Sequence, residues 1–112
     1  MKQLLSLLFL FASAFAFAET IDVYQKDKQF VVKGNTIKNK GTPDITIKQG
    51  DVVRFYNDDE FFHNVFSLSD AKLFDLGSYP KGEYREIEFD QKGVVEIECA
   101  IHPNMFMSIE VK

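Results

Sequence analysis

The alternation of apolar and polar residues along most of the chain predicts β-strands and no long helix. Apolar side chains recur at every second position in short runs such as residues 21–24, 45–47 and 83–89. Turn-forming groups such as Gly50-Asp51 and Pro80-Lys81-Gly82 separate these runs. Seven or eight strands of this kind are typical of an all-β sandwich or barrel formed by one domain.

The stretch from residue 63 to residue 79 is the least regular part of this pattern. Residues 63–68 are predicted to be extended, whereas residues 74–79 alternate poorly. A short helix between Leu68 and Phe74 therefore stays open as an alternative to a strand.

The first residues differ from the rest of the chain because they form an almost unbroken apolar run. Lys2 provides a positive start, residues 4–17 are nearly all apolar, and Ala16-Phe17-Ala18 is a small-x-small cleavage motif. This is the layout of a secretory signal peptide. An uncleaved membrane anchor is the weaker alternative, because a spanning helix needs about 20 apolar residues. No cysteine stands at the cleavage point to carry a lipid.

Cleavage after Ala18 would divide the chain into a signal peptide, residues 1–18, and one mature domain, residues 19–112. We therefore predict an exported, periplasmic protein without stable membrane insertion of the mature chain. The 112 residues carry a formal charge of −4, and removing 18 residues whose only charge is Lys2 leaves 94 residues with a charge of −5. This charge argues against nucleic acid as a partner. A chain of this size can bury enough surface to fold as a monomer without disulfides.

Residues with metal-binding chemistry are few in this chain. It has one cysteine, Cys99, and two histidines, His63 and His102. A single cysteine cannot form an internal disulfide, so in an exported protein it is a buried thiol, an intermolecular disulfide or a metal ligand. Strand alternation places Cys99 on the inner face of its strand, together with Val95 and Ile97.

A tight turn with two further donors follows Cys99 directly. The segment reads Cys99-Ala100-Ile101-His102-Pro103-Asn104-Met105-Phe106-Met107, so a thiolate, an imidazole and a thioether can meet around one point. The two sulfur donors suit copper(I), and imidazole suits copper in both oxidation states. Methionine is not among the usual zinc ligands. Two histidines, one cysteine and a weak axial methionine form the blue-copper electron-transfer arrangement, with His63 as the second histidine.

These motifs resemble those of the cupredoxins, the type 1 blue-copper proteins that include plastocyanin, amicyanin and pseudoazurin. The resemblance lies in His63-Asn64-Val65-Phe66 and in Cys99-x-x-His102-Pro103-x-Met105. The run Gly50-Asp51-x-Val53-x-Phe55-x-Asn57 is also similar to the strand that leads into the first histidine ligand. The resemblance covers roughly residues 36–111 and implies a cupredoxin-like Greek-key β-sandwich.

The resemblance also implies a set of copper ligands. The equatorial ligands would be His63, Cys99 and His102, and the axial ligand would be Met105. Asn64 matches a residue that ties the two ligand-bearing segments together. Met107 stays open as the axial ligand, because plastocyanin and pseudoazurin have a longer spacing from histidine to methionine. We prefer Met105 because the last strand then aligns with the short-loop members.

The function implied by the resemblance is one-electron transfer. The protein would hold one copper ion per chain, cycling between Cu(I) and Cu(II), and would not be an enzyme. Its partners would be redox proteins such as a c-type cytochrome or an oxidoreductase. Two alternatives stay open: a periplasmic copper chaperone or buffer, and a metal-free interaction module. The acidic run Asp58-Asp59-Glu60 is interpreted as a solvated turn, with partner docking as its alternative.

Overall fold

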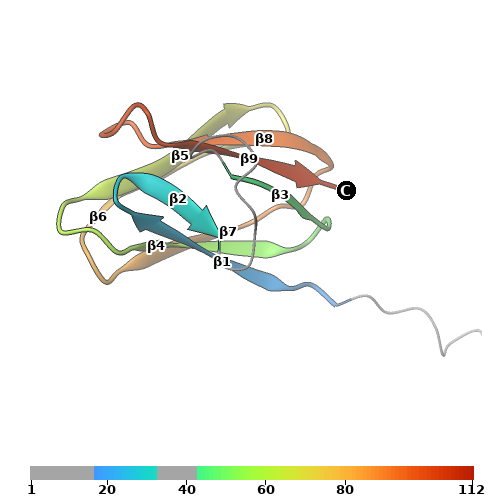
Figure 1. The fold of residues 1–112 in the computed structure, drawn as a ribbon. Coiled ribbons are helices and arrows are strands. Elements are labelled where there is room, and N and C mark those ends of the chain that lie inside the picture. The colour runs from blue at the N-terminus through green and yellow to red at the C-terminus, as the bar shows by residue number, and fades with distance from the viewer. Residues whose placement is uncertain (1–16, 33–42) are drawn as a thin grey trace, which may run out of the picture.

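The computed structural model describes residues 17–32 and 43–112, which form a sandwich of two β-sheets (Figure 1). The strands are β1 (Thr20–Lys26), β2 (Gln29–Val32), β3 (Asp44–Ile47), β4 (Val52–Asn57), β5 (His63–Ser69), β6 (Lys72–Tyr79), β7 (Tyr84–Glu88), β8 (Gly93–Glu98) and β9 (Phe106–Val111). One sheet has the order β2-β1-β4-β7, and the other has the order β3-β9-β8-β5-β6. The all-β sandwich expected from the sequence is therefore confirmed.

The irregular stretch before residue 79 is a strand. β6 pairs antiparallel with β5 after a turn at Asp70 and Ala71, so the alternative of a short helix there is wrong. β6 lies at the edge of its sheet, where Leu73 is 70% exposed and Gly77 has a positive φ. The pairing of β5 with β6 also shifts register next to Gly77, between the pairs Asn64–Ser78 and Phe66–Asp75, and this irregularity interrupts the alternation. The described residues form nine strands where seven or eight were expected, and β6 is the additional strand.

The predicted signal peptide lies almost entirely outside the described residues, which begin at Phe17. Within the part of the chain that the structure describes, no helix has the length and apolar character needed to span a membrane.

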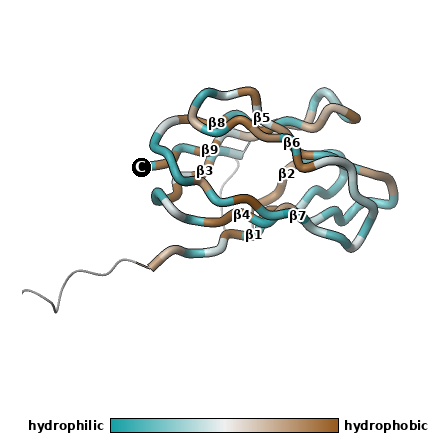
Figure 2. Tube along the Cα trace, turned by 180° about the vertical axis from the view of Figure 1, so that it is seen from behind, coloured by the Kyte–Doolittle hydropathy of each residue, from teal (hydrophilic) through white to brown (hydrophobic). Residues whose placement is uncertain are grey.

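The core lies between the inner faces of the two sheets, as the alternating hydropathy along the strands indicates (Figure 2). β4 alternates half-buried and buried residues, with Val53 and Phe55 fully buried. The Phe55 ring meets Phe30 edge-to-face, with centroids 6.1 Å apart. Burial of each such side chain stabilises the fold by roughly 1.5–3 kcal/mol.

Strand pairing brings three distant turns to one end of the sandwich. β1 and β4 are parallel, with Gln25 opposite Asn57, so the turns that follow these strands lie together. β5 and β8 are antiparallel, with Phe66 opposite Glu98, so the start of β5 lies beside the loop that follows β8. The two histidines and the cysteine all lie at this end.

Candidate metal centre

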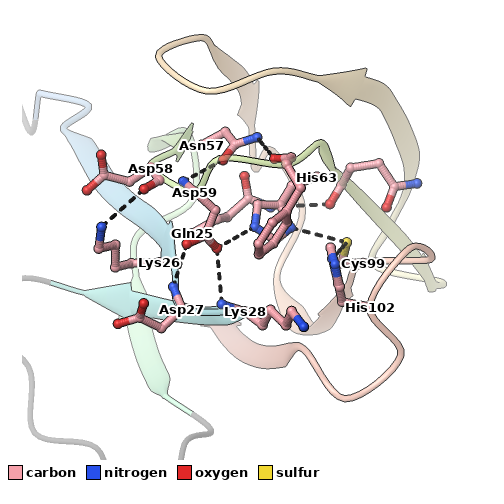
Figure 3. Close-up of polar contacts among 12 residues, drawn as sticks. Gln25, Lys26, Asp27, Lys28, Asn57, Asp58, Asp59, His63, Cys99 and His102 are labelled. Carbon is pink, nitrogen blue, oxygen red and sulfur yellow. Dashed lines mark hydrogen bonds and ion pairs between the residues drawn. The ribbon is translucent and has the colours of Figure 1, made fainter.

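His63, Cys99 and His102 come together at the end of the sandwich, although 36 residues separate His63 from Cys99. One donor atom from each side chain lies within 4.8 Å of the other two. The Cys99 Sγ lies 3.7 Å from the Nδ1 of His63 and 3.8 Å from the Nδ1 of His102 (Figure 3). Both imidazoles therefore present the same ring nitrogen to the sulfur.

These separations fit a metal ion at the centre of the three donors. Typical bonds of about 2.3 Å to sulfur and about 2.0–2.1 Å to nitrogen, spread at trigonal angles, separate sulfur from nitrogen by roughly 3.8 Å. The donor chemistry fits as well, because a soft thiolate together with two imidazoles suits copper. The residues present therefore fit a copper ion in the type of donor and in the two separations between sulfur and nitrogen.

His63 is fully buried, and its second ring nitrogen is held by a carboxylate. Its Nε2 lies 2.7 Å from the Oδ2 of Asp59. Asp59 is 6% exposed, and it also accepts the backbone N–H groups of Asp27 and Lys28 at 2.8 and 3.0 Å. Burial on its own would raise the pKa of Asp59, but the bonds from His63, Lys28 and Asp27 outweigh it and lower the pKa.

An ionised Asp59 fixes which nitrogen of the imidazole donates to it. Because a carboxylate only accepts hydrogen bonds, the Nε2 of His63 is the donor of this pair, and Nδ1 is the nitrogen that faces Cys99. A partner of this kind orients a ligand histidine and raises its basicity.

The interpretation of residues 58–60 as a solvated turn is wrong for Asp59 and right for its neighbours. Asp58 and Glu60 are exposed, whereas Asp59 points inwards between the turn after β1 and His63. The sequence contained one signal, an aspartate four residues before a histidine, but only the parallel pairing of β1 with β4 makes it a buried contact.

His102 is the half-buried member of the group and lies at the surface. The ring of Phe61 packs against it, with centroids 4.9 Å apart, and a shallow pocket of about 250 Å³ next to it includes Lys28 and Met105. Burial lowers the pKa of His102, and the positive charge of Lys28 lowers it further. A neutral imidazole with a free Nδ1 is the form that binds a metal.

The two candidate methionines are both buried but occupy different positions. β8 and β9 pair Ile97 with Met107, and continuing this register by two residues places Met105 opposite Cys99. The backbone N–H of Met105 also donates to the carbonyl of His102 at 2.9 Å, which closes the loop. Met105 therefore lies beside the cysteine and histidine, and Met107 packs deeper in the core.

Asn64 connects the two segments that carry the donors, as the resemblance implies. Its Oδ1 accepts the backbone N–H of Ala100 at 2.7 Å, directly after Cys99. Its backbone carbonyl accepts the Nε2 of Gln25 at 3.3 Å, and the Oε1 of Gln25 accepts the hydroxyl of buried Tyr79. This buried network behind His63 was not apparent from the sequence. Burial, aided by the charge of Cys99, raises the pKa of Tyr79, so its hydroxyl remains a donor.

A family model of copper-binding proteins, the plastocyanin/azurin family, matches residues 27–112. Among solved structures, a Cu(I) form of an amicyanin mutant has a TM-score of 0.68 at 20% identity, over 83% of this chain and 82% of that chain. A reduced Cu(I) form of a second amicyanin mutant has a TM-score of 0.64 at 20% identity, over 90% of this chain and 88% of that one.

A copper-containing nitrite reductase from Thermus scotoductus has a TM-score of 0.68 at 23% identity. The match covers 83% of this chain but 22% of the reductase. No curated protein sequence matches the chain. At these identities the solved structures establish the fold alone.

Proposed function

Because the chain belongs to the plastocyanin/azurin family of copper-binding proteins, we propose that it is an exported carrier of single electrons. Copper is its cofactor. The copper ligands that we propose are His63, Cys99, His102 and Met105.

The single observation that carries the proposal is the spacing of the three strong donors. The Cys99 sulfur stands 3.7 and 3.8 Å from two Nδ1 atoms, a separation that a trigonal metal ion would leave. Met105 is buried beside them and supplies the weak axial thioether of a type 1 site. We prefer it to Met107 because Met107 pairs with Ile97 within the sheet, whereas Met105 belongs to the loop of His102, whose carbonyl accepts the Met105 N–H.

Bound copper supplies the chemistry of the carrier, a one-electron change between Cu(I) and Cu(II). The protein's part is to keep the donors in place in both states. Asp59 holds His63 through Nε2, and Asn64 holds the backbone after Cys99. Because His63, Cys99 and Met105 are each 1% exposed or less, packing resists a change of ligand position.

We propose that the redox partner docks over His102. This ligand lies nearest to solvent, and exposed apolar side chains gather in the segments around it, namely Phe61, Phe62, Ile101 and Phe106. An apolar rim of this kind excludes water when a partner covers it. The negative charge of the mature chain favours a partner with a basic surface, such as a c-type cytochrome.

The same arrangement supports a carrier and not an enzyme. Catalytic metal sites keep an open position for substrate, whereas here four protein side chains supply the ligands and three of them are buried. We further propose that the mature chain, residues 19–112, acts in the periplasm as a monomer.

The test is the visible spectrum of the purified protein with copper(II) added, before and after chemical reduction. The parent should show an intense thiolate-to-copper band that disappears on reduction and returns on oxidation. Cys99→Ser should lose the band, and Met107→Leu, which changes a buried core residue of the neighbouring strand, should keep it. A band retained by Cys99→Ser would refute the ligand assignment. A protein that took up copper without a band and released it to an acceptor would instead be a chaperone or buffer.

A further inference from the structure

Asp51 is a buried carboxylate directly before β4. His63 follows the other end of that strand, so Asp51 lies away from the copper site. It is 2% exposed. Its Oδ1 accepts the backbone N–H of Glu19 at 2.9 Å, and its Oδ2 accepts that of Lys48 at 2.8 Å. No part of the copper site described above uses this group.

Glu19 is the residue at which the described chain joins the sandwich. Its carbonyl accepts the backbone N–H of Val52 at 2.9 Å, and β1 begins at the next residue. Before it, Phe17 is 80% exposed, Ala18 is also exposed, and neither residue belongs to a strand. The cleavage motif Ala16-Phe17-Ala18 therefore ends where contact with the domain begins.

The charges around Asp51 leave a place for a cation. Buried carboxylates are normally paired with a positive group, but both bonds to Asp51 come from neutral peptide N–H groups. Lys48 lies nearby, and its ammonium bonds the Glu19 side chain at 3.4 Å. The other charged residue beside this shallow pocket is Lys112. The burial of Asp51 on its own would raise its pKa. The hydrogen bonds from the two peptide N–H groups and the charge of Lys48 outweigh this effect and lower the pKa.

We propose that the chain is processed between Ala18 and Glu19, and that Asp51 is the binding site for the α-ammonium group which this cleavage creates. A signal peptidase hydrolyses the Ala18–Glu19 peptide bond with one water molecule. Ala18 leaves with a new carboxylate, and the Glu19 nitrogen becomes an amine that takes up a proton at neutral pH. The nitrogen that already lies 2.9 Å from Oδ1 then carries a positive charge.

The consequence is that export and processing stabilise the folded domain. The Glu19 N–H already donates to an ionised carboxylate, and cleavage adds the attraction between two opposite unit charges at this short distance. We expect the folding equilibrium constant of the processed chain to be about fivefold to tenfold larger, a range that corresponds to about 1 kcal/mol. The inference rests on the proposed export but not on copper binding, so it can fail while the carrier function stands.

The site of cleavage is tested on the full chain, expressed with its own leader. Mass spectrometry of the exported protein should give a chain that begins at Glu19. A first residue other than Glu19 would overturn the inference.

The role of Asp51 is tested on chains with defined first residues, released from a cleavable fusion. One begins at Glu19, and the control begins at Phe17 and keeps an amide at the Glu19 nitrogen. Both contain all nine described strands. In denaturant titrations at pH 7, the chain that begins at Glu19 should be the more stable. The advantage should disappear when both chains also carry Asp51→Asn. Equal stability of the two parent chains, or an advantage that survives Asp51→Asn, would overturn the proposal.

A second measurement does not depend on whether the Asp51→Asn chains fold. NMR titration of the chain that begins at Glu19 should give an α-amino pKa above the ordinary range of about 7.7–8.0. Since the folded pKa is the raised one, the added stability is present below that range and is lost as the pH rises through the folded pKa. Glu19, Lys48, Lys112 and Asp51 are the charged groups at the site. A pKa within or below the ordinary range would equally overturn the proposal.

Discussion

Replacing Asp59 by asparagine should raise the reduction potential of the copper site. The substitution removes one negative charge and keeps the size of the side chain. In the structure this charge lies 2.7 Å from the Nε2 of His63, on the side of the ring opposite to Nδ1. A negative charge at this position stabilises Cu(II) more than Cu(I), so its removal favours the reduced state.

The size of the shift follows from the distance. An ion held by the Nδ1 of His63 would stand on the order of 6–7 Å from the Asp59 carboxylate, given a metal–nitrogen bond of about 2.0–2.1 Å. Coulomb's law with an effective dielectric constant of about 20 then gives about 2.5 kcal/mol for one unit of charge. For a one-electron couple this energy corresponds to about 100 mV.

The substitution should also destabilise the copper-free protein. Asp59 accepts three donors, from His63, Asp27 and Lys28. The amide group of asparagine can accept on one side only, so at least one of the three donors loses its partner, at a cost of up to about 1–3 kcal/mol.

Voltammetry of the copper-loaded protein measures the potential, and Glu60→Gln is the matched control. Glu60 undergoes the same loss of charge one residue away, but its side chain is 82% exposed and water screens it. We expect a large positive shift for Asp59→Asn and a small one for Glu60→Gln. Equal shifts would mean that only the net charge matters. An unchanged or lowered potential for Asp59→Asn would show that Asp59 does not act on the copper through His63.

Three further predictions concern the ligands and the partner. Met105→Leu should change the reduction potential while copper stays bound. Met107→Leu should leave the potential nearly unchanged and cost less than about 1.5 kcal/mol of stability. Voltammetry that gave the reverse order would make Met107 the axial ligand. His63→Ala should abolish tight copper binding in a copper titration, because no third histidine can replace it; parental affinity would exclude His63 as a ligand. Transfer to a basic cytochrome, followed by stopped-flow, should slow as salt rises because screening weakens steering; a rate independent of ionic strength would indicate apolar docking.

The all-β class and the candidate donors could be predicted because both depend on local properties of the sequence. Alternation with a period of two places Cys99 and Ile97 on the inner face wherever the strand lies. The only cysteine and both histidines fall in recognisable motifs, so few other donor sets were possible. β6 was less clear because its register with β5 shifts next to Gly77, and this irregularity interrupts the alternation.

Contacts between distant segments were decided by the tertiary structure alone. The hydrogen bond from the backbone of Ala100 to the side chain of Asn64 joins segments 36 residues apart, and it exists only because β5 lies beside β8. Asp59 looked like one more residue of a solvated turn until the parallel pairing of β1 with β4 placed it against a hairpin 32 residues away.

The chain by itself therefore determined which atoms could bind copper, because composition limits the available donors and a period of two fixes the face on which each one lies. The packing of the two sheets decided what surrounds those atoms. Whether a carboxylate is solvated or buried against an imidazole depends on which strands pair, and strand pairing is a property of the whole sandwich that no local pattern specifies.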